Sequence, residues 1–281
     1  MKISPFTPLF FDTEPQSDGV PSRGMQLWST TDQILVEVFC GNLETPPTAA
    51  IINGISGDEL QSITWNSWAM NANKTLYFCT IQGLSPGYYK MQIGDLESAV
   101  FRVTDNEFLL SKTTLIQYRF KDNRQRDDVV SIIDYMEYFF DFRVQGGFKD
   151  SGWQFGVANE QFTTQHEDVV ELYATDYVMK TFTMGDACGL PVWYGEMLNR
   201  LLTCSYVYFD GVRYTRNESD TPTVNTLVDG LDSFVFTQTL RKAQILDAEV
   251  EALNQLILRR LDTTYYRAAD INNENINRLI K

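Results

Sequence analysis

The sequence has one histidine, His166, and four widely separated cysteines. No Cys-x-x-Cys pair occurs, so a zinc knuckle is not expected. The chain also lacks a Gly-x-Ser-x-Gly nucleophile motif and a glycine-rich phosphate loop. His166 lies in a polar run beside Glu167 and Asp168, where we predict an exposed residue and not a catalytic base. We therefore predict no enzyme active site, no cofactor and no bound metal.

Long apolar runs and positive charge are scarce as well. No stretch approaches the ~20 apolar residues that span a bilayer, and the first residues lack the apolar core of a signal peptide. We therefore expect synthesis in the cytoplasm and no membrane anchor. The net charge is −14, from 37 acids and 23 bases, and residues 1–104 and 105–245 both carry an acidic excess. Without a basic patch, binding of nucleic acid is not expected.

The cysteines leave two alternatives for one pair. Cys40 and Cys79 could face each other across two sheets as a disulfide, or remain as buried thiols. Because no secretory signal is recognised, we expect all four cysteines, including Cys188 and Cys204, to be reduced and buried.

Residues 24–104 show short alternating runs between turn signals, the pattern of an all-β unit. In the run from Gln33 to Cys40, the residues Ile34, Val36, Val38 and Cys40 share one face. Asn53-Gly54 predicts a two-residue hairpin turn. Residues 84–89 follow the pattern Leu-x-Pro-Gly-x-Tyr, which resembles the tyrosine corner of immunoglobulin-like sandwiches. We predict an immunoglobulin-like β-sandwich, preceded by an N-terminal arm over residues 1–23.

Residues 105–245 predict an α+β domain with longer, aromatic-rich strands. The strand candidates include residues 114–120, 137–144 and 169–184, and Asp210-Gly211 predicts a tight hairpin. The helix candidate begins near Pro191. Its apolar stripe consists of Trp193, Met197, Leu198, Leu201 and Leu202.

Residues 246–281 predict a C-terminal helix followed by a polar tail. The helical stripe over residues 246–261 consists of Leu246, Val250, Leu253, Ile257 and Leu261. Because the stripe follows two apparently complete domains, we predict that it is bare and forms an assembly interface.

Aromatic residues near Gly147 have three open interpretations. Phe148, Trp153 and Phe155 could stack on a sugar, pack a core or form a subunit contact, and we favour packing. We include Phe148 and Trp153 in the predicted assembly interface. A glycosidase-like pair of carboxylates is a further alternative, although acids of this abundance usually coat a surface. The available acids are Asp127, Asp128, Glu160 and Glu167.

Four runs of the chain resemble a known group of proteins: residues 113–128, 144–162, 183–216 and 231–242. They are similar to uncharacterised virion proteins of bacteriophages of gut Bacteroides, including crAss-like phages. The resemblance implies a structural part of the neck, ring or tail, in which subunits form a connector-like ring around the DNA channel. It implies no catalytic residues. Portal, ring or tail subunits are the expected partners, and the virion is the expected location.

Two other classes of function remain open at this point. A β-sandwich could serve as a glycan-binding or peptide-binding module. A hydrolase could use carboxylates that no motif singles out. Our first hypothesis is a homo-oligomeric, non-enzymatic virion component.

Overall fold

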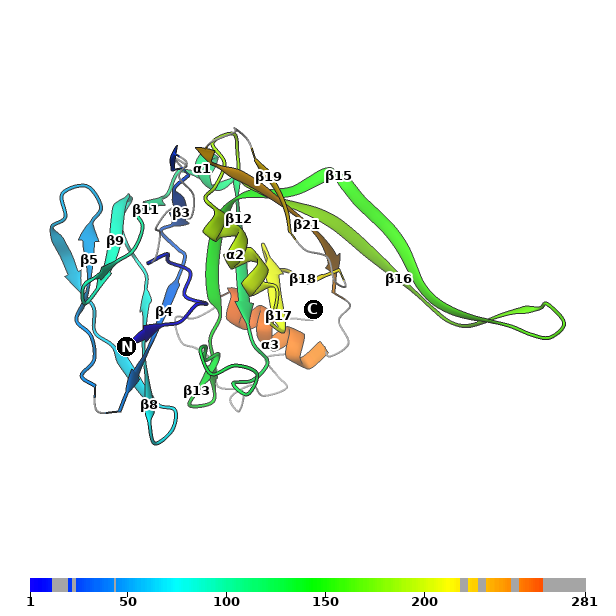
Figure 1. The fold of residues 1–281 in the computed structure, drawn as a ribbon, viewed down its shortest axis with the longest axis horizontal. Helices are drawn as coiled ribbons and strands as arrows, with labels where there is room; N and C mark the ends of the chain where they lie inside the picture. Colours follow the sequence, from blue (N-terminus) through cyan, green and yellow to red (C-terminus); the bar gives the residue numbers. More distant parts are fainter. Residues whose placement is uncertain are drawn as a thin grey trace.

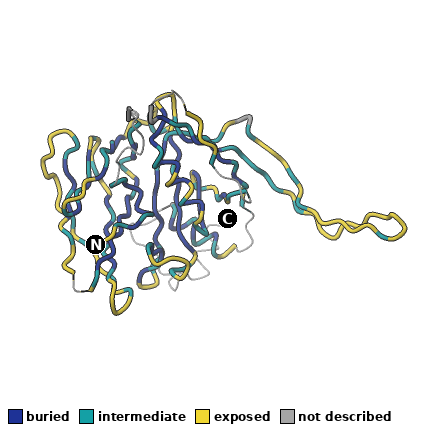
Figure 2. Tube along the Cα trace, in the orientation of Figure 1, coloured by how far each residue is buried: buried dark blue, intermediate teal, exposed yellow. Residues whose placement is uncertain are grey.

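The protein is mainly β, with several sheets and few helices. The structure is a computed structural model that describes residues 1–11, 20–21, 24–42, 44–217, 222–226, 231–243 and 248–259. A body of packed sheets carries one long two-stranded arm (Figure 1). Buried residues concentrate in the body, and exposed residues dominate the outer part of the arm (Figure 2).

The N-terminal region consists of two facing sheets. The first has the order β1 (Lys2–Ile3), β4 (Ile34–Gly41), β8 (Lys74–Ile81) and β7 (Asn66–Ala69). The second has the order β3 (Gln26–Ser29), β11 (Phe101–Thr104), β9 (Gly87–Ile93), β5 (Ala49–Asn53) and β6 (Glu59–Ser62), with β10 (Leu96–Glu97) paired to β9. β2 (Val20–Pro21) pairs with β20 (Leu231–Asp232).

The apolar residues between these sheets form one core. Ile34, Val36, Val38 and Cys40 lie in it together with residues of β5, β9 and β11, as the alternation in the sequence predicts. Trp28 is fully buried in the same core. The two-layer arrangement follows because each sheet buries one apolar face against the other.

One predicted turn is wrong and another is confirmed. Residues 54–58 join β5 to β6, so Asn53-Gly54 is not a two-residue turn. The Asn53 side chain accepts hydrogen bonds from the backbone amides of Ile55 and Ser56, and Gly57 has φ +78°. Asp210 and Gly211 have φ values of 47° and 78°, and Phe209 pairs directly with Val212. That geometry is the tight hairpin expected from Asp-Gly.

The second region is a sheet that closes on itself. β12 pairs with β15 and β17, and the pairings continue through β18, β21 and β16 back to β15. β19 adds to the first half of β21. The bounds are β12 (Thr113–Arg119), β15 (Phe140–Thr163), β16 (Val169–Met184), β17 (Tyr206–Phe209), β18 (Val212–Arg216), β19 (Thr223–Thr226) and β21 (Phe234–Lys242). A small hairpin of β13 (Ile132–Ile133) and β14 (Met136–Glu137) precedes β15.

Within the described residues, three helices accompany the sheets: α1 (Glu107–Leu110), α2 (Val192–Leu201) and α3 (Ala248–Arg259). α2 begins after Pro191, as predicted, and buries Met197, Leu198 and Leu201 in the main core. A Cβ at Gly195 would lie 2.3 Å from the Phe236 ring, so glycine permits the close approach of α2 to β21.

The two regions share the main core. Leu35 and Phe39 on the outer face of β4 belong to the same apolar cluster as Ile116, Phe140 and Phe142 of the closed sheet. β11 ends at Thr104 and β12 begins at Thr113, close to the predicted boundary. Independent folding of residues 24–104 and 105–245 stays a prediction.

Candidate assembly surface

The β15–β16 arm is the most exposed element of the body's closed sheet. Residues 140–145 of β15 pair with β12, and from Gly146 onward β15 pairs only with β16. Residues 179–184 of β16 pair with β21, beginning with Met179 opposite Arg241. Residues 169–178 pair only with β15. The hairpin therefore leaves the body as a two-stranded ribbon (Figure 1). An isolated ribbon is only marginally stable in water, so a partner surface is expected to stabilise it.

Two glycines shape the root of the arm. Gly146 has φ +127°, and a Cβ there would lie 2.1 Å from the Thr183 carbonyl oxygen, so only glycine fits this bend. Gly156 lies under the ring of Tyr177, and the Arg241 guanidinium lies 4.2 Å from the centre of that ring. The stack of Gly156, Tyr177 and Arg241 braces the arm against β21.

Large apolar side chains are exposed along the outer arm, which we define as residues 153–179. Trp153 is 47% exposed and Phe155 is 79% exposed, and their rings stack with centroids 6.1 Å apart. The other exposed members are Val157, Phe162, Val169, Val170, Leu172 and Tyr173. Cross-strand pairing places Trp153 and Phe155 on one face and Phe162 with Val170 on the other. Both faces of the outer arm therefore expose large apolar side chains.

The tip of the arm is a polar turn. The Asp168 amide donates to the Thr164 hydroxyl at 3.1 Å, and Glu167 has φ +65°. His166 is exposed there, as predicted. Glu160 and Glu167 lie on the arm, whereas Asp127 and Asp128 lie in the body, where they bond to Lys74 and Arg126. The four acids named as a hydrolase alternative are not brought together.

The predicted interface residues of the aromatic segment divide between two environments. Trp153 lies on the exposed arm, where its ring is 3.6 Å from the Lys180 amino group, and its role in assembly stays a prediction. Phe148 instead packs within the chain against Phe182 and Tyr214, with ring centroids 5.3 and 4.7 Å away. Phe148 is half-buried and packs against the main core, and its role in an assembly interface stays a prediction.

The C-terminal stripe is not bare. Ile257, Val250 and Leu253 of α3 pack on a cluster formed by Phe139, Tyr206 and Tyr208 on the outer face of the closed sheet. The premise of the predicted interface is therefore wrong for these three residues, because a partner for the stripe exists in the same chain. Leu246 and Leu261 lie outside the described residues.

A buried polar network fixes α3 in place. The Arg119 side chain is 2% exposed, donates to Asn254 at 2.7 Å and forms an ion pair with Glu137 at 2.6 Å. The Tyr208 hydroxyl donates to Glu251 at 2.8 Å and accepts from Asn254 at 3.0 Å. Burial lowers the pKa of Arg119 and raises that of Tyr208. Arg119 and Tyr208 belong to the closed sheet, and Glu251 and Asn254 belong to α3. These bonds hold α3 against the body.

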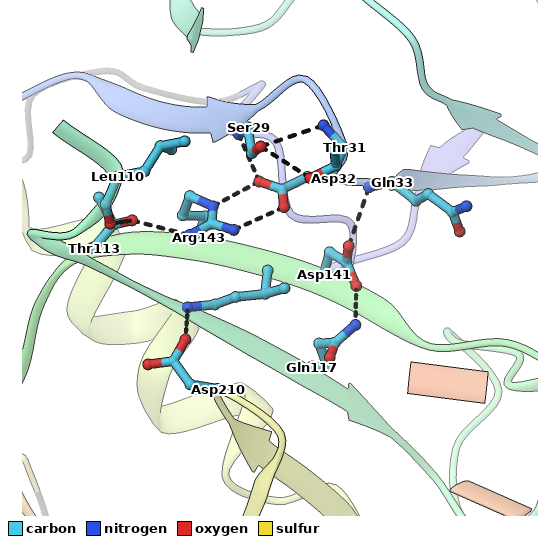
Figure 3. Close-up of polar contacts among 11 residues, drawn as sticks. Ser29, Thr31, Asp32, Gln33, Leu110, Thr113, Gln117, Asp141, Arg143 and Asp210 are labelled. Carbon is cyan, nitrogen blue, oxygen red and sulfur yellow. Dashed lines mark hydrogen bonds and ion pairs between the residues drawn. The ribbon is translucent and has the colours of Figure 1, made fainter. Parts of the chain in front are cut away.

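A second polar network joins the N-terminal sheets to the closed sheet (Figure 3). Arg143 of β15 donates two bonds to Asp32, at 2.6 and 2.9 Å, and a third to Thr113 at 3.0 Å. Asp141 accepts from the Gln33 amide at 3.1 Å and from Gln117 at 2.9 Å. Burial would lower the pKa of Arg143, but its bonds and charge attraction to Asp32 raise it. The network therefore holds the N-terminal sheets against β15, the strand that continues into the arm.

In the described part of the chain, no three His, Cys, Asp or Glu side chains are grouped so that they could hold a metal ion. Cys40 and Cys79 are buried, unbridged thiols, whereas Cys188 is exposed, so the expectation that all four are buried is wrong. Among the same residues, no helix has the length and apolar character needed to cross a membrane.

Comparison of the chain with models of protein families, with curated proteins and with solved structures found no match.

Proposed function

We propose that the chain is a structural subunit of a bacteriophage virion, in the neck, ring or tail, where it forms a homo-oligomeric ring around the DNA channel. The observation that carries this proposal is the long β15–β16 arm with apolar side chains exposed on both faces. A surface of this kind gains free energy when a partner covers it. The virion and the portal, ring or tail partners come from the resemblance of residues 105–245.

The body has the properties that a subunit of such an assembly needs. The Arg143–Asp32 pair and the shared apolar core connect the two regions at many points. β15 runs without interruption from the body, where it carries Asp141 and Arg143, into the arm. A rigid body with one projecting ribbon can place that ribbon on a neighbour without a large ordering cost.

We further propose that residues 24–104 form an immunoglobulin-like sandwich. The support is the corner at the start of β9, where the Tyr89 hydroxyl donates to the Ser85 carbonyl oxygen at 2.8 Å. A tyrosine that bonds to the backbone a few residues upstream is a recurring feature of these sandwiches. The module acts here as a rigid platform beside the closed sheet.

Particle composition tests the proposal. Purified particles of the phage that encodes the chain, analysed by quantitative mass spectrometry, are expected to contain it in several copies per portal ring. Presence in the infected-cell lysate but absence from washed particles would contradict a virion role. A complementation test with an arm-shortened chain then asks whether incorporation needs the arm.

One observation favours a second function. The stacked rings of Trp153 and Phe155 form an exposed aromatic platform of the kind that binds sugars. A glycan array with the purified chain tests this alternative. Saturable binding that is lost in Trp153→Ala, while particle incorporation is unchanged, would favour the glycan-binding module.

A further inference from the structure

The outer arm presents an open strand edge on each of its two sides. From Gly146 onward β15 pairs only with β16, and residues 169–178 of β16 pair only with β15. Among the described strands, none lies beside the other edge of either stretch (Figure 1). The backbone N–H and C=O groups along such an edge form a template to which another strand can add.

Neither edge carries the residues that usually prevent strand addition. Residues 153–163 and 169–178 contain no proline, lysine or arginine, although lysine and proline are common means of protecting an edge. One irregularity lies near the tip, where a register shift leaves Leu172 without a cross-strand partner. Closer to the body, residues 155–160 pair with residues 173–178 without interruption. This regular part of the arm is open to strand addition on both sides.

The pairing inside the chain shows that the two strands suit each other. Antiparallel neighbours place paired residues on the same face, whichever edge of the strand they use. The outer edge of β16 in one copy can therefore pair with the outer edge of β15 in a second copy in the register that the chain already uses. This compatibility selects a second copy as the partner, because that copy supplies the complementary strand.

The charges of the arm permit this register. Glu160 lies opposite Tyr173 and Asp176 lies opposite Val157, so no two acids of the regular part face each other directly. The outer arm as a whole carries five acids and no lysine or arginine. Neighbouring arms therefore repel each other at longer range, and salt lowers this cost because it screens the charges.

We infer that the outer arms of several copies lie side by side, with β16 of one copy paired to β15 of the next, and close into a common β-barrel. The two edges differ, so the contact is head-to-tail, and such contacts repeat until a ring closes. Closure leaves no strand edge open. This inference rests on the proposed function and names the contact that joins the copies.

Two physical terms stabilise the contact. Backbone hydrogen bonds form along both edges of each arm, and apolar side chains leave water. Phe155 of one copy then lies opposite Val178 of the next, as the two residues do within the chain. Exposed residues dominate the outer part of the arm in the single chain (Figure 2). Pairing with neighbours therefore stabilises a ribbon that is marginal alone.

Single cysteines on the two edges test the contact. All chains carry Cys188→Ser, which removes an exposed thiol. A chain with Ala174→Cys is co-expressed with a differently tagged chain that carries one β15 cysteine, and the purified complexes are oxidised. The β15 cysteines occupy exposed positions that cover the in-chain register and a shift of two residues either way: Val157→Cys, Asn159→Cys and Gln161→Cys.

A disulfide between the differently tagged chains is expected in at least one of the three pairs. Each single-cysteine chain expressed alone is expected to give none, because in a head-to-tail barrel its own position recurs two strands away, beyond the ~7 Å between Cα atoms that a disulfide can bridge. The matched control pairs Ala174→Cys with Glu59→Cys, at an exposed position of β6, and is also expected to give none. Circular dichroism and thermal melting verify that the variants are folded.

The contradictory outcomes are distinct. If the chain is oligomeric by mass photometry and none of the three pairs forms a disulfide, the contact lies elsewhere and the inference is wrong. Disulfide dimers of Asn159→Cys alone would mean that two β15 edges meet, which also overturns it. A chain that is monomeric at all concentrations yet occurs in particles removes the arm contact and leaves the virion role. Absence from washed particles, whatever the disulfide pattern, contradicts the proposed function instead.

Discussion

Glu37 is a carboxylate in the interior of the protein. Its side chain is fully buried on the outer face of β4, and its Oε2 accepts a bond from the Val130 amide at 3.2 Å. Burial raises the pKa of Glu37 well above its usual value, and the nearby charge of Asp128 adds to the rise. The alternation of residues 33–40 predicts that Glu37 faces away from the sandwich core. It does not predict that the closed sheet packs on that face and buries the side chain.

Replacement of Glu37 by glutamine is expected to stabilise the protein at neutral and alkaline pH. Folding raises this pKa, so the stability that the group contributes is fully present below the unfolded-state pKa, near 4.5, and is lost as pH rises through the folded-state value. Urea unfolding of Glu37→Gln at pH 5 and pH 8 measures the effect. A larger gain at pH 5 than at pH 8 would contradict it.

The cysteines give a second prediction at this scale. Cys188 is exposed, whereas Cys40 and Cys79 are buried and burial raises the pKa of Cys79 to about 12. A thiol reagent at pH 8 is expected to modify Cys188 first, and to find four thiols after denaturation. Only two thiols in the denatured chain would mean that a disulfide is present.

At the scale of elements, α3 is part of the folded body. A chain that ends at Ala243 loses Asn254 and Glu251, which bond to the buried side chains of Arg119 and Tyr208. We expect it to be destabilised by ~3 kcal/mol or more, because a buried polar network with one side removed is costly. Urea denaturation measures the loss. A control that ends at Arg259 keeps all of α3, and equal stability of the two shortened chains would contradict this role.

The arm shows how far the sequence can be interpreted. The alternation of residues 169–184 predicted β16 correctly. β15 was recognised only up to Val144, because Gly146, Gly147 and the polar residues that follow resemble a loop. In the structure Gly146 permits the bend and the close approach of the backbone at the root of the arm. Closure of the sheet and docking of α3 depend on contacts between distant residues, so no local pattern could indicate them.

At the scale of the whole molecule, a body with a shared apolar core carries one exposed ribbon. The two regions share a core and the Asp32–Arg143 pair, and α3 is held by its own network. Much of the exposed apolar surface lies on the outer arm instead. This division predicts that the arm contributes to assembly and little to the stability of the body.

Removal of the outer arm tests that central claim most directly. Replacement of residues 154–179 by Asn-Gly joins Trp153 to its cross-strand partner Lys180 through a two-residue turn. Mass photometry and thermal melting, compared with the full chain, are the measurement. We predict a folded monomer with a melting temperature within a few degrees of the full chain, alongside oligomers of the full chain. A shortened protein that still assembles like the full chain would contradict the account.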